Sequence, residues 1–295
     1  MPETHQWINN NGVNLYVVTE GDPHQPALVL VHGYPDNHSV WDAVTRHLVS
    51  HYFVIRYDVR GAGRSSSPAS TRDYGMHYLA ADLACVVDTV IPGRSFHLAG
   101  HDWGSIQSWE SVTTRPLSSR VLSYTTISGP CIDHVATWIR GNLTANGKTG
   151  RRKVLQQLAS SWYVLLFQLP LLPEALWYIG LDRLWPTYLA RREQVTNSIP
   201  DPFQKKDGCH GVKLYRANFL PRLLRPRSRH AFCPVQLIVP GQDNYVGQQL
   251  TEDLEQWSGK LVRRDIDAPH WVVLTHPEEI AGWIDEFART QEGAT

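Results

Sequence analysis

The sequence has few cysteines, and their spacing excludes the common metal and redox motifs. Its four cysteines, Cys85, Cys131, Cys209 and Cys233, include no C-x-x-C pair, so neither a zinc knuckle nor a redox-active pair is predicted. No disulfide framework is visible, which favours a reducing compartment and a cytoplasmic location. The first residues also lack an apolar stretch, and we therefore expect no secretory signal.

Signals for cofactors, metals and nucleic acid are equally weak. Gly61 and Gly63 lack the third glycine and the later acidic residue of a dinucleotide-binding loop, so this stretch is predicted to be a structural turn. His97 and His101 fall on a strand and a turn rather than on one helix face, and no metal site is predicted. The 28 Lys and Arg residues balance the 28 Asp and Glu residues. We expect no cofactor and no nucleic-acid partner.

Short apolar segments alternate with helical patterns along most of the chain. The run Ala27–Val31 is wholly apolar, as is typical of a central strand buried on both faces. Helices are predicted near 79–90 and 277–288, where apolar residues recur every three or four positions. This alternation predicts an α/β fold with a mainly parallel, doubly wound sheet. The other strands are expected at 13–18, 52–57, 96–99, 121–127, 235–239 and 261–266.

Residues 134–229 differ from the rest of the chain in having no strand pattern. This segment is aromatic and helical, and its 16 Lys and Arg against 5 Asp and Glu give it a net charge of +11. We therefore expect a core formed by 1–133 and 230–295, with 134–229 inserted as a helical cap. The apolar stretch 164–181 is interrupted by prolines and polar residues, so no transmembrane segment is predicted. Solvated helix faces explain most of the charge, and peripheral contact of the basic cap with a membrane is the alternative.

The chain is organised around Gly100-His101-Asp102-Trp103-Gly104, which follows a predicted strand and precedes a helical pattern. This is the strand–turn–helix context of a nucleophile elbow, G-x-Nu-x-G, with Asp102 in the nucleophile position. Glycines two residues either side allow the sharp turn and the close approach of strand and helix. The alternative for Asp102 is a helix N-cap, a common place for aspartate.

An aspartate nucleophile selects a different reaction from a serine nucleophile. A serine that attacks an alkyl carbon would give a stable ether, whereas a carboxylate gives an alkyl ester that water can cleave. An unperturbed aspartate ionises at about pH 3.9, so it needs no base to activate it. A nearby histidine is then free to activate water for the second step.

Two further stretches supply partners for Asp102. His32-Gly33-Tyr34-Pro35 follows a predicted strand, and the N–H groups of Tyr34 and Trp103 are expected to form an oxyanion hole. Asp243 and His270 follow later strands, in the chain order nucleophile, acid, histidine. His270 would take a proton from water while Asp243 fixes its tautomer. The weaker rivals are His276 for the histidine and Asp265 or Asp267 for the acid.

These stretches, with Gly241-Gln242-Asp243 and His270-Trp271, resemble the epoxide hydrolases of the α/β-hydrolase superfamily over nearly the whole chain. Within that family the chain is similar to the hydrolase part of fused mycobacterial epoxide hydrolase–short-chain dehydrogenase proteins, the epoxide hydrolase D type. The resemblance implies an α/β-hydrolase fold with a helical cap. It also implies that these residues are one portion of a longer polypeptide.

The family's cap tyrosines hydrogen-bond the epoxide oxygen and protonate it when the ring opens. Tyr163, in Ser-Trp-Tyr-Val-Leu-Leu-Phe, matches the first of them. The second usually stands in Asn-Trp-Tyr-Arg, and the stretch 218–222 reads Asn-Phe-Leu-Pro-Arg, with Leu220 in the tyrosine's place. Tyr215 is the candidate for a second acid, although five residues along a helix is a rotation of about 140°, so it would not simply substitute.

The leading hypothesis is an epoxide hydrolase that opens a bulky apolar epoxide, such as a lipid-derived one, to a vicinal diol through an ester at Asp102. The remaining pocket residues are expected to be His32, Pro35, Trp162, Phe219 and Trp271. A haloalkane dehalogenase shares the aspartate nucleophile, but such enzymes commonly hold halide with asparagine where Tyr34 stands. The third hypothesis is a non-catalytic lipid-binding module. Water is the second substrate, and a monomer or homodimer is expected.

Overall fold

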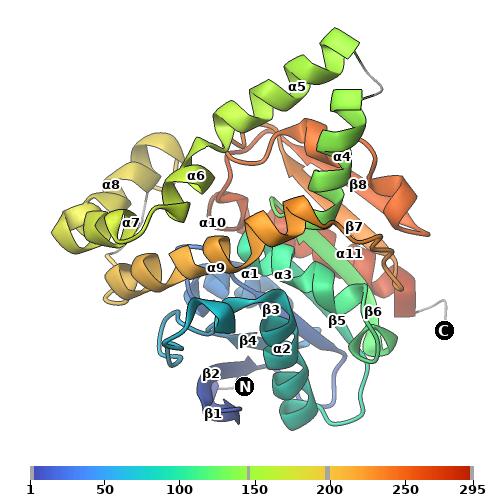
Figure 1. Cartoon of the computed structure of the whole chain (residues 1–295). Helices are drawn as coiled ribbons and strands as arrows, with labels where there is room; N and C mark the ends of the chain where they lie inside the picture. The colour runs from blue at the N-terminus through green and yellow to red at the C-terminus, as the bar shows by residue number, and fades with distance from the viewer. Residues whose placement is uncertain (1–2, 145–146, 197–199, 293–295) are drawn as a thin grey trace.

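The computed structural model describes residues 3–144, 147–196 and 200–292. Its centre is an eight-stranded sheet in the order β1-β2-β4-β3-β5-β6-β7-β8 (Figure 1). The strands from β4 to β8 are parallel, whereas β2 runs antiparallel to both β1 and β4. Their bounds are β1 Thr4–Asn10, β2 Val13–Glu20, β3 Ala27–Val31, β4 Phe53–Tyr57, β5 Phe96–His101, β6 Val121–Ile127, β7 Val235–Pro240 and β8 Leu261–Ile266.

The predicted central strands are confirmed because burial on both faces leaves a plain sequence signal. All residues of β3, β4 and β5 are buried, so β3 is a continuous apolar run, whereas β4 and β5 are mainly apolar and include Arg56, His97 and His101. Strand β1 is the one that the sequence analysis missed. It is an edge strand with only Ile8 fully buried, and its Trp7 is exposed. An edge strand of this kind carries too few apolar residues to be recognised.

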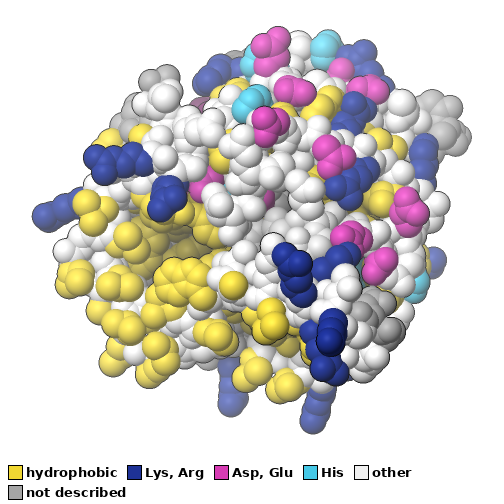
Figure 2. Space-filling model, turned by 90° about the horizontal axis from the view of Figure 1, so that it is seen from above, with side chains coloured by type: hydrophobic (Ala, Val, Ile, Leu, Met, Phe, Trp, Pro, Cys, Tyr) yellow, Lys and Arg dark blue, Asp and Glu magenta, His cyan; other side chains and the backbone are white. Residues whose placement is uncertain are grey.

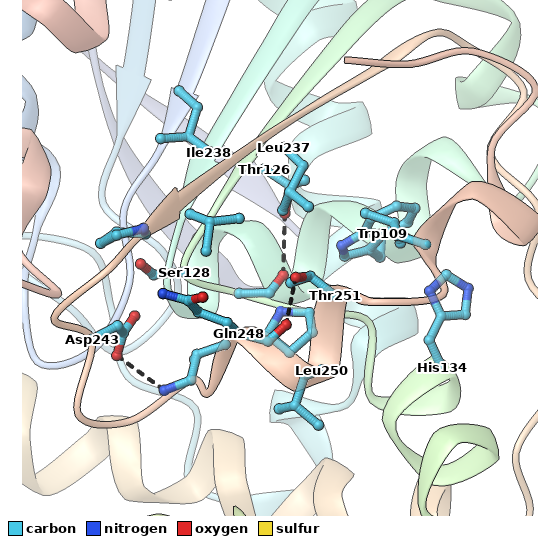
Figure 3. Close-up of a pocket in the computed structure, with 16 residues that line it drawn as sticks. Trp109, Thr126, Ser128, His134, Leu237, Ile238, Asp243, Gln248, Leu250 and Thr251 are labelled. Atoms are coloured by element: carbon cyan, nitrogen blue, oxygen red, sulfur yellow. Dashed lines mark hydrogen bonds between the residues drawn. The ribbon is translucent and has the colours of Figure 1, made fainter. Parts of the chain in front are cut away.

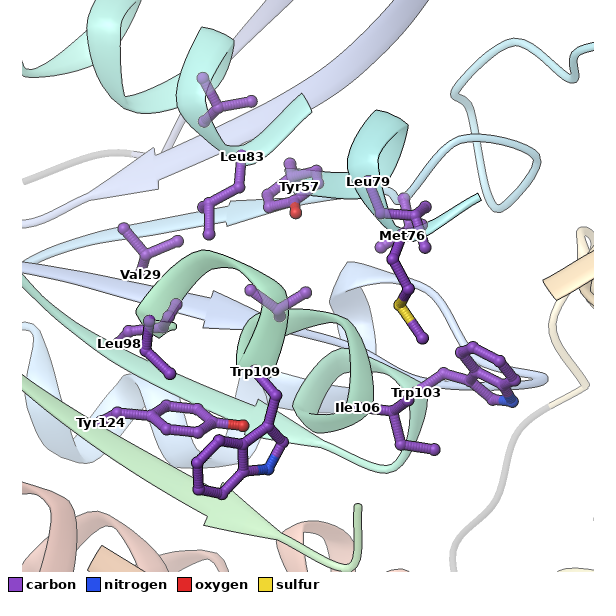
Figure 4. Close-up of a cluster of buried hydrophobic side chains, with 14 of the residues drawn as sticks. Val29, Tyr57, Met76, Leu79, Leu83, Leu98, Trp103, Ile106, Trp109 and Tyr124 are labelled. Carbon is purple, nitrogen blue, oxygen red and sulfur yellow. The ribbon is translucent and has the colours of Figure 1, made fainter. Parts of the chain in front are cut away.

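Helices cover both faces of the sheet, as an α/β-hydrolase fold requires. Helices α1 and α11 pack together on one face, and α2 and α3 pack together on the other. Figure 4 shows the apolar core on the α2–α3 face, where Leu83 points toward Val29 on the sheet and Leu79 lies beside Met76 and Tyr57. The bounds of these helices are α1 Asp42–Leu48, α2 Met76–Val90, α3 Trp103–Val112, α10 Val272–Thr275 and α11 Pro277–Glu292.

The segment predicted to be a cap contains only helices in its described residues. Figure 1 shows α5 to α8 above one end of the sheet, while α9 lies across the core below them. The first helix of the cap, α4, begins at Ile132, two residues before the predicted boundary at residue 134. The bounds are α4 Ile132–Thr144, α5 Gly147–Ser160, α6 Trp162–Gln168, α7 Leu172–Leu176, α8 Asp182–Arg192 and α9 Gln204–Leu224, with a π-helical turn at Trp177–Leu181. Among the helices that the structure describes, none is long and apolar enough to cross a membrane.

The Gly61-x-Gly63 turn of the core forms hydrogen bonds with helix α9 of the cap. Asp207 of α9 accepts a hydrogen bond from the Gly63 N–H at 2.7 Å, and Lys206 donates to the Gly63 and Ser65 carbonyls at 2.7 and 2.6 Å. These contacts fix the start of α9, the cap helix that passes over the elbow. The two glycines have positive φ values, and a Cβ would lie 2.6 Å from the Tyr74 hydroxyl at position 61 and 2.1 Å from an Asp58 oxygen at position 63, so the turn itself requires them.

Candidate active site

Asp102 stands at the turn between β5 and α3. Its backbone has φ 51° and ψ −122°, a strained conformation found at sharp functional turns. A Cβ at Gly104 would lie 2.0 Å from the Val31 carbonyl oxygen, and one at Gly100 would lie 2.6 Å from the Gly104 oxygen. Both flanking glycines are therefore needed for helix and strand to approach as the elbow pattern predicts.

The Asp102 carboxylate turns away from its own helix. Asp102 occupies the N-cap position of α3, but its side chain makes no capping hydrogen bond, so capping does not explain the residue. Instead, its Oδ1 accepts a hydrogen bond from the Tyr34 N–H at 2.7 Å. Its Oδ2 lies 3.6 Å from Nε2 of His270, beyond an ordinary hydrogen bond. One oxygen is therefore anchored, and the other faces the histidine.

Gly33 allows the Tyr34 amide to reach the nucleophile. A Cβ at position 33 would lie 2.4 Å from Oδ1 of Asp102, so any side chain there would displace the carboxylate. The Tyr34 phenol is buried and points toward the cap, where it donates to the Gly208 carbonyl at 3.1 Å and accepts from Nε1 of Trp177 at 2.9 Å. The backbone N–H of Tyr34 thus binds Asp102, and its side chain binds the cap. The Trp103 N–H, at the start of α3, remains the predicted second donor.

The structure brings His270 and Asp243 together beside Asp102. Nδ1 of His270 lies 2.9 Å from Oδ2 of Asp243. The other oxygen of Asp243 accepts the N–H groups of Tyr245 at 2.8 Å and Val246 at 3.0 Å, and Figure 3 shows the carboxylate held by the loop that follows it. This arrangement fixes the Asp243 carboxylate and leaves Nε2 of His270 facing the nucleophile.

The pKa values of His270 and Asp243 reflect a buried imidazole that lies between two carboxylates. Burial alone would lower the pKa of His270, but the charges of Asp243 and Asp102 raise that pKa well above its ordinary value. Burial alone would raise the pKa of Asp243, and His270 with the two loop N–H groups brings that pKa below its ordinary value. The resting site therefore favours a charged imidazolium between two carboxylates.

The rival residues from the sequence lie elsewhere. His276 contacts Oγ1 of Thr275 at 2.9 Å, and its ring is not among the residues that line the cavity at Asp102. Asp265 is exposed and pairs with Arg263, while Asp267 accepts a hydrogen bond from Gln242. None of the three contacts the nucleophile. Within the described residues, no group of three or more His, Cys, Asp or Glu side chains is placed to hold a metal ion.

A cavity of about 500 Å³ lies between the core and the cap and opens onto Asp102 and His270. Of the five remaining pocket residues predicted from the sequence, Pro35, Trp162 and Trp271 line it. The prediction is wrong for His32, whose ring is buried in the core between the Gly33 carbonyl and the Val59 N–H. Its two ring nitrogens are occupied by backbone groups, so it supports the oxyanion loop instead.

Phe219 is also misplaced by the sequence analysis. Its ring stacks on Tyr215 with centroids 5.5 Å apart and meets the ring of Trp103 at 5.7 Å, so it lies behind the cavity wall. The residue supports Tyr215 and does not line the cavity.

A much smaller void of about 20 Å³ lies behind Asp243, between Trp109, His134 and Leu250, and has room for about one water molecule (Figure 3).

Two cap tyrosines share the cavity with Asp102. Tyr163 of α6 and Tyr215 of α9 both line the cavity, with ring centroids 6.0 Å apart. Burial raises the pKa of both phenols, and the negative charge of Asp102 raises each of them further. The two phenols are therefore neighbours, and their raised pKa values keep both protonated at neutral pH.

The placement of Tyr215 corrects the expectation that it would not substitute for the second tyrosine. Leu220, which was matched to that tyrosine, is 57% exposed on α9 and does not line the cavity. The missed signal is the pair Tyr215-Arg216, which supplies the Tyr-Arg end of the expected Asn-Trp-Tyr-Arg. Arg216 pairs with Glu174 of α7 and ties α9 to the rest of the cap.

Several residues of the site had no sequence signal. Glu193, just after α8, is fully buried, and its Oε2 accepts the main-chain N–H of His270 at 3.0 Å. Burial raises the pKa of this glutamate. The ring of Tyr245 lies 4.8 Å from that of His270, and its hydroxyl contacts the hydroxyl of Tyr188. Nε1 of Trp271 donates to Asp36 at 2.9 Å. These contacts join segments that are distant in the sequence.

Known proteins resemble the chain in both sequence and structure. The "Probable oxidoreductase EphD" of Mycobacterium tuberculosis is 35% identical over 99% of this chain, and the match covers 51% of that protein. The chain thus spans about half the length of this relative. Epoxide hydrolase 3 of Xenopus tropicalis is 24% identical, with 96% of this chain and 76% of that protein covered.

A crystal structure of the epoxide hydrolase of Bacillus megaterium, in complex with an inhibitor, has the same fold. It superposes with a TM-score of 0.79 at 21% identity, covering 96% of this chain and all of that one. The family described as alpha/beta hydrolase fold matches residues 26–277, which include the elbow, Asp243 and His270. The chain belongs to the α/β-hydrolase fold family.

Proposed function

We propose that the chain hydrolyses an epoxide to a vicinal diol through a covalent ester at Asp102. One observation carries the proposal: a carboxylate at the elbow and two neighbouring phenols on the cap face the same cavity. An epoxide needs a nucleophile at carbon and an acid at oxygen at the same time, and this pairing supplies both. Relatives named as epoxide hydrolases support the proposal.

In the first step, an Asp102 oxygen attacks the less hindered ring carbon and the bond from that carbon to the epoxide oxygen breaks. The oxygen takes a proton from Tyr163 or Tyr215, whose ring centroids lie 6.0 Å apart at the cavity. Two donors at one developing alkoxide stabilise it more than one does. The product of this step is a β-hydroxyalkyl ester of Asp102.

In the second step, water attacks the ester carbonyl carbon of Asp102. His270 takes the proton from water, and Asp243 stabilises the resulting imidazolium at a distance of 2.9 Å. The carbonyl oxygen becomes an oxyanion that accepts the Tyr34 N–H, which already holds Oδ1 in the free enzyme, and the Trp103 N–H. The bond from the carbonyl carbon to the alkyl oxygen then breaks, and the leaving alkoxide takes the proton of the new Asp102 carboxyl group. The diol leaves, Asp102 is again a carboxylate, and the tyrosine recovers its proton from solvent.

The walls of the cavity indicate the substrate class. Most of its lining is aromatic or aliphatic, including Phe167, Leu176, Trp177 and Trp185 of the cap. A volume of about 500 Å³ accommodates a substrate well above the size of a simple alkene oxide. We therefore propose a bulky apolar epoxide, a class that includes lipid-derived epoxides.

Trapping of the ester tests the proposal. The variant His270→Gln, incubated with a panel of aryl and long-chain epoxides, is expected to gain the mass of one epoxide, because the second step lacks its base. The adduct should map to the peptide containing Asp102 and should be absent from the double variant Asp102→Asn/His270→Gln. The control His276→Gln should turn over and show no adduct. No adduct with any epoxide, together with halide release from bromoalkanes, would favour the dehalogenase hypothesis.

A further inference from the structure

The cap carries a large apolar surface that the fold leaves uncovered. It runs along the consecutive segment from α6 to α8, and each of its side chains is between 45% and 80% exposed. We call it the cap apolar face. Its members are Trp162, Leu165, Leu169, Leu171, Leu172, Tyr178, Ile179 and Leu184. Exposed apolar surfaces of this extent mark sites that contact another apolar phase.

The periodicity of α6 shows that this exposure is systematic. Trp162, Leu165 and Leu169 recur at helical spacing on the outer side, while Tyr163 and Phe167 on the inner side line the cavity. A helix that is apolar all round needs a second apolar environment on its outer side. Figure 2 shows hydrophobic side chains gathered over one half of the face seen from above, around a hollow.

Positive charge borders the cap apolar face. Arg183, Arg191 and Arg192 of α8 are exposed, and none forms an ion pair with a residue that the structure describes. Arg191 follows Leu184 by two helical turns, on the same side of α8. On α5, Arg151 precedes the exposed Leu155 by one turn. Figure 2 shows Lys and Arg side chains at the edges of the hydrophobic area.

The carboxylates of the cap do not offset this charge at the surface. The five acidic residues of 134–229 are all buried or only partly exposed. Glu174 pairs with Arg216 and Asp182 with Lys205, while Glu193 and Asp207 are buried against the core. The outer surface of the cap is therefore apolar in its middle and positive at its border.

The cap apolar face is continuous with the mouth of the cavity. Trp162 and Arg192 are both exposed, and both also line the cavity that contains Asp102. A hydrophobic molecule that leaves the surface at Trp162 can thus enter the cavity without crossing bulk water.

We propose that the cap apolar face docks on the surface of an anionic phospholipid bilayer. Its apolar side chains would enter the boundary between headgroups and acyl chains, and the arginines would contact lipid phosphates. An apolar surface with a cationic border is the combination that binds such interfaces. The proposal does not depend on the reaction at Asp102. It places the cavity mouth against the phase in which a bulky apolar substrate dissolves.

A second copy of the chain fits the surface less well. A symmetric dimer through the cap apolar face would bring its arginine borders, from Arg183 to Arg192, close to those of the partner copy. The described carboxylates that could separate those charges are already paired or buried within each cap. An anionic lipid surface supplies the missing opposite charge.

Vesicle flotation of the purified chain tests the proposal. We expect binding to phosphatidylcholine vesicles that contain about 30% phosphatidylglycerol, with little binding to phosphatidylcholine alone and weaker binding at high salt. The variants Leu165→Ser/Ile179→Ser and Arg183→Gln/Arg191→Gln should each bind at least about tenfold more weakly. These side chains are exposed, so the substitutions leave the packing of the fold intact.

The matched control changes the same residue types elsewhere on the cap. Leu224→Ser/Arg225→Gln alters exposed residues at the end of α9, outside the cap apolar face, and should bind like the unmodified chain. Failure of the unmodified chain to bind anionic vesicles would overturn the proposal, as would equal binding by all variants. A dimer in solution that Leu165→Ser/Ile179→Ser converts to monomer, with no vesicle binding, would assign the surface to a second copy instead.

Discussion

Replacing Tyr215 by phenylalanine separates the two interpretations of the cap. If Leu220 occupies the place of a second acid, Tyr215 is only a packing residue and its hydroxyl has no role. If Tyr215 is the second acid, it shares the developing alkoxide with Tyr163. The structure favours the second interpretation because both phenols line the cavity and sense the charge of Asp102.

The magnitude follows from what the substitution removes. The Tyr215 ring stays in place, since it stacks on Phe219 and meets Trp103 edge-on at 4.9 Å. The loss of a buried hydroxyl should therefore lower the free energy of unfolding by only about 1 kcal/mol. The loss of one donor to the alkoxide should raise the barrier to ring opening by about 2.7–4 kcal/mol, which lowers kcat by about 10²–10³. Tyr163→Phe should give a loss of similar size.

The assay is single-turnover ester formation in the His270→Gln background, because it reports ring opening alone. Tyr178→Phe, on the exposed side of the cap, is the matched control and should leave the rate unchanged. Leu220→Tyr in the Tyr215→Phe background should restore nothing, since position 220 points to solvent. The reasoning is refuted if Tyr215→Phe opens epoxides within about twofold of the unmodified rate, or if Leu220→Tyr restores it.

Three further substitutions test the surrounding structure. Glu193→Ala should lower kcat about tenfold by leaving the buried N–H of His270 unpaired, and Glu193→Gln, which can still accept that N–H, should recover most of it in steady-state assays. Burial raises the pKa of Asp36 to about 7, so its ionisation destabilises the folded chain increasingly as pH rises from about 4 to about 7. Asp36→Asn should therefore gain thermal stability relative to the unmodified chain at pH 8 but not at pH 4, and a constant difference would contradict this. Gly104→Ala would place a Cβ 2.0 Å from a strand carbonyl oxygen and should lower the free energy of unfolding by about 3 kcal/mol or prevent folding. The control Gly282→Ala adds a Cβ in open space and should cause no such loss; urea denaturation measures both.

The parts of the fold that the sequence predicts are those whose signal is local. The buried parallel strands are short, mainly apolar runs. The elbow is a five-residue pattern whose two glycines are needed because a Cβ at either would lie only 2.0–2.6 Å from a backbone oxygen. Asp243 and His270 could be predicted because each follows a recognisable strand or precedes a helix. The antiparallel edge strand β1 was missed because it is half exposed and carries a single buried side chain, Ile8.

The parts that the sequence did not predict depend on how the cap rests on the core. Glu193 reaches the loop of His270 across 77 residues of chain, and no local pattern indicates that contact. Tyr215 was judged from its spacing to Leu220, but the side of α9 that faces the cavity is set by Asp207 at its start and by the packing of Phe219 on Trp103. The misplaced His32 shows the same limit, because its ring accepts a hydrogen bond from the Val59 N–H, 27 residues away on a loop that meets it only in the fold.

In the proposed mechanism, the electrostatics of the resting site give the two steps an order. In the free enzyme, Asp243 and Asp102 together raise the pKa of His270, so the imidazole holds a proton and is a poor base. Formation of the ester turns the Asp102 carboxylate into a neutral group and removes one of the two charges that favour the imidazolium. The pKa of His270 then falls, the imidazolium releases its extra proton to solvent, and the neutral ring can accept a proton from water at the stage when water must attack. Asp243, held by two loop N–H groups, keeps its charge throughout and so stabilises the imidazolium when it forms again. In this mechanism Asp102 therefore also controls the pKa of His270, because its carboxylate is charged before the ester forms and neutral while the ester exists.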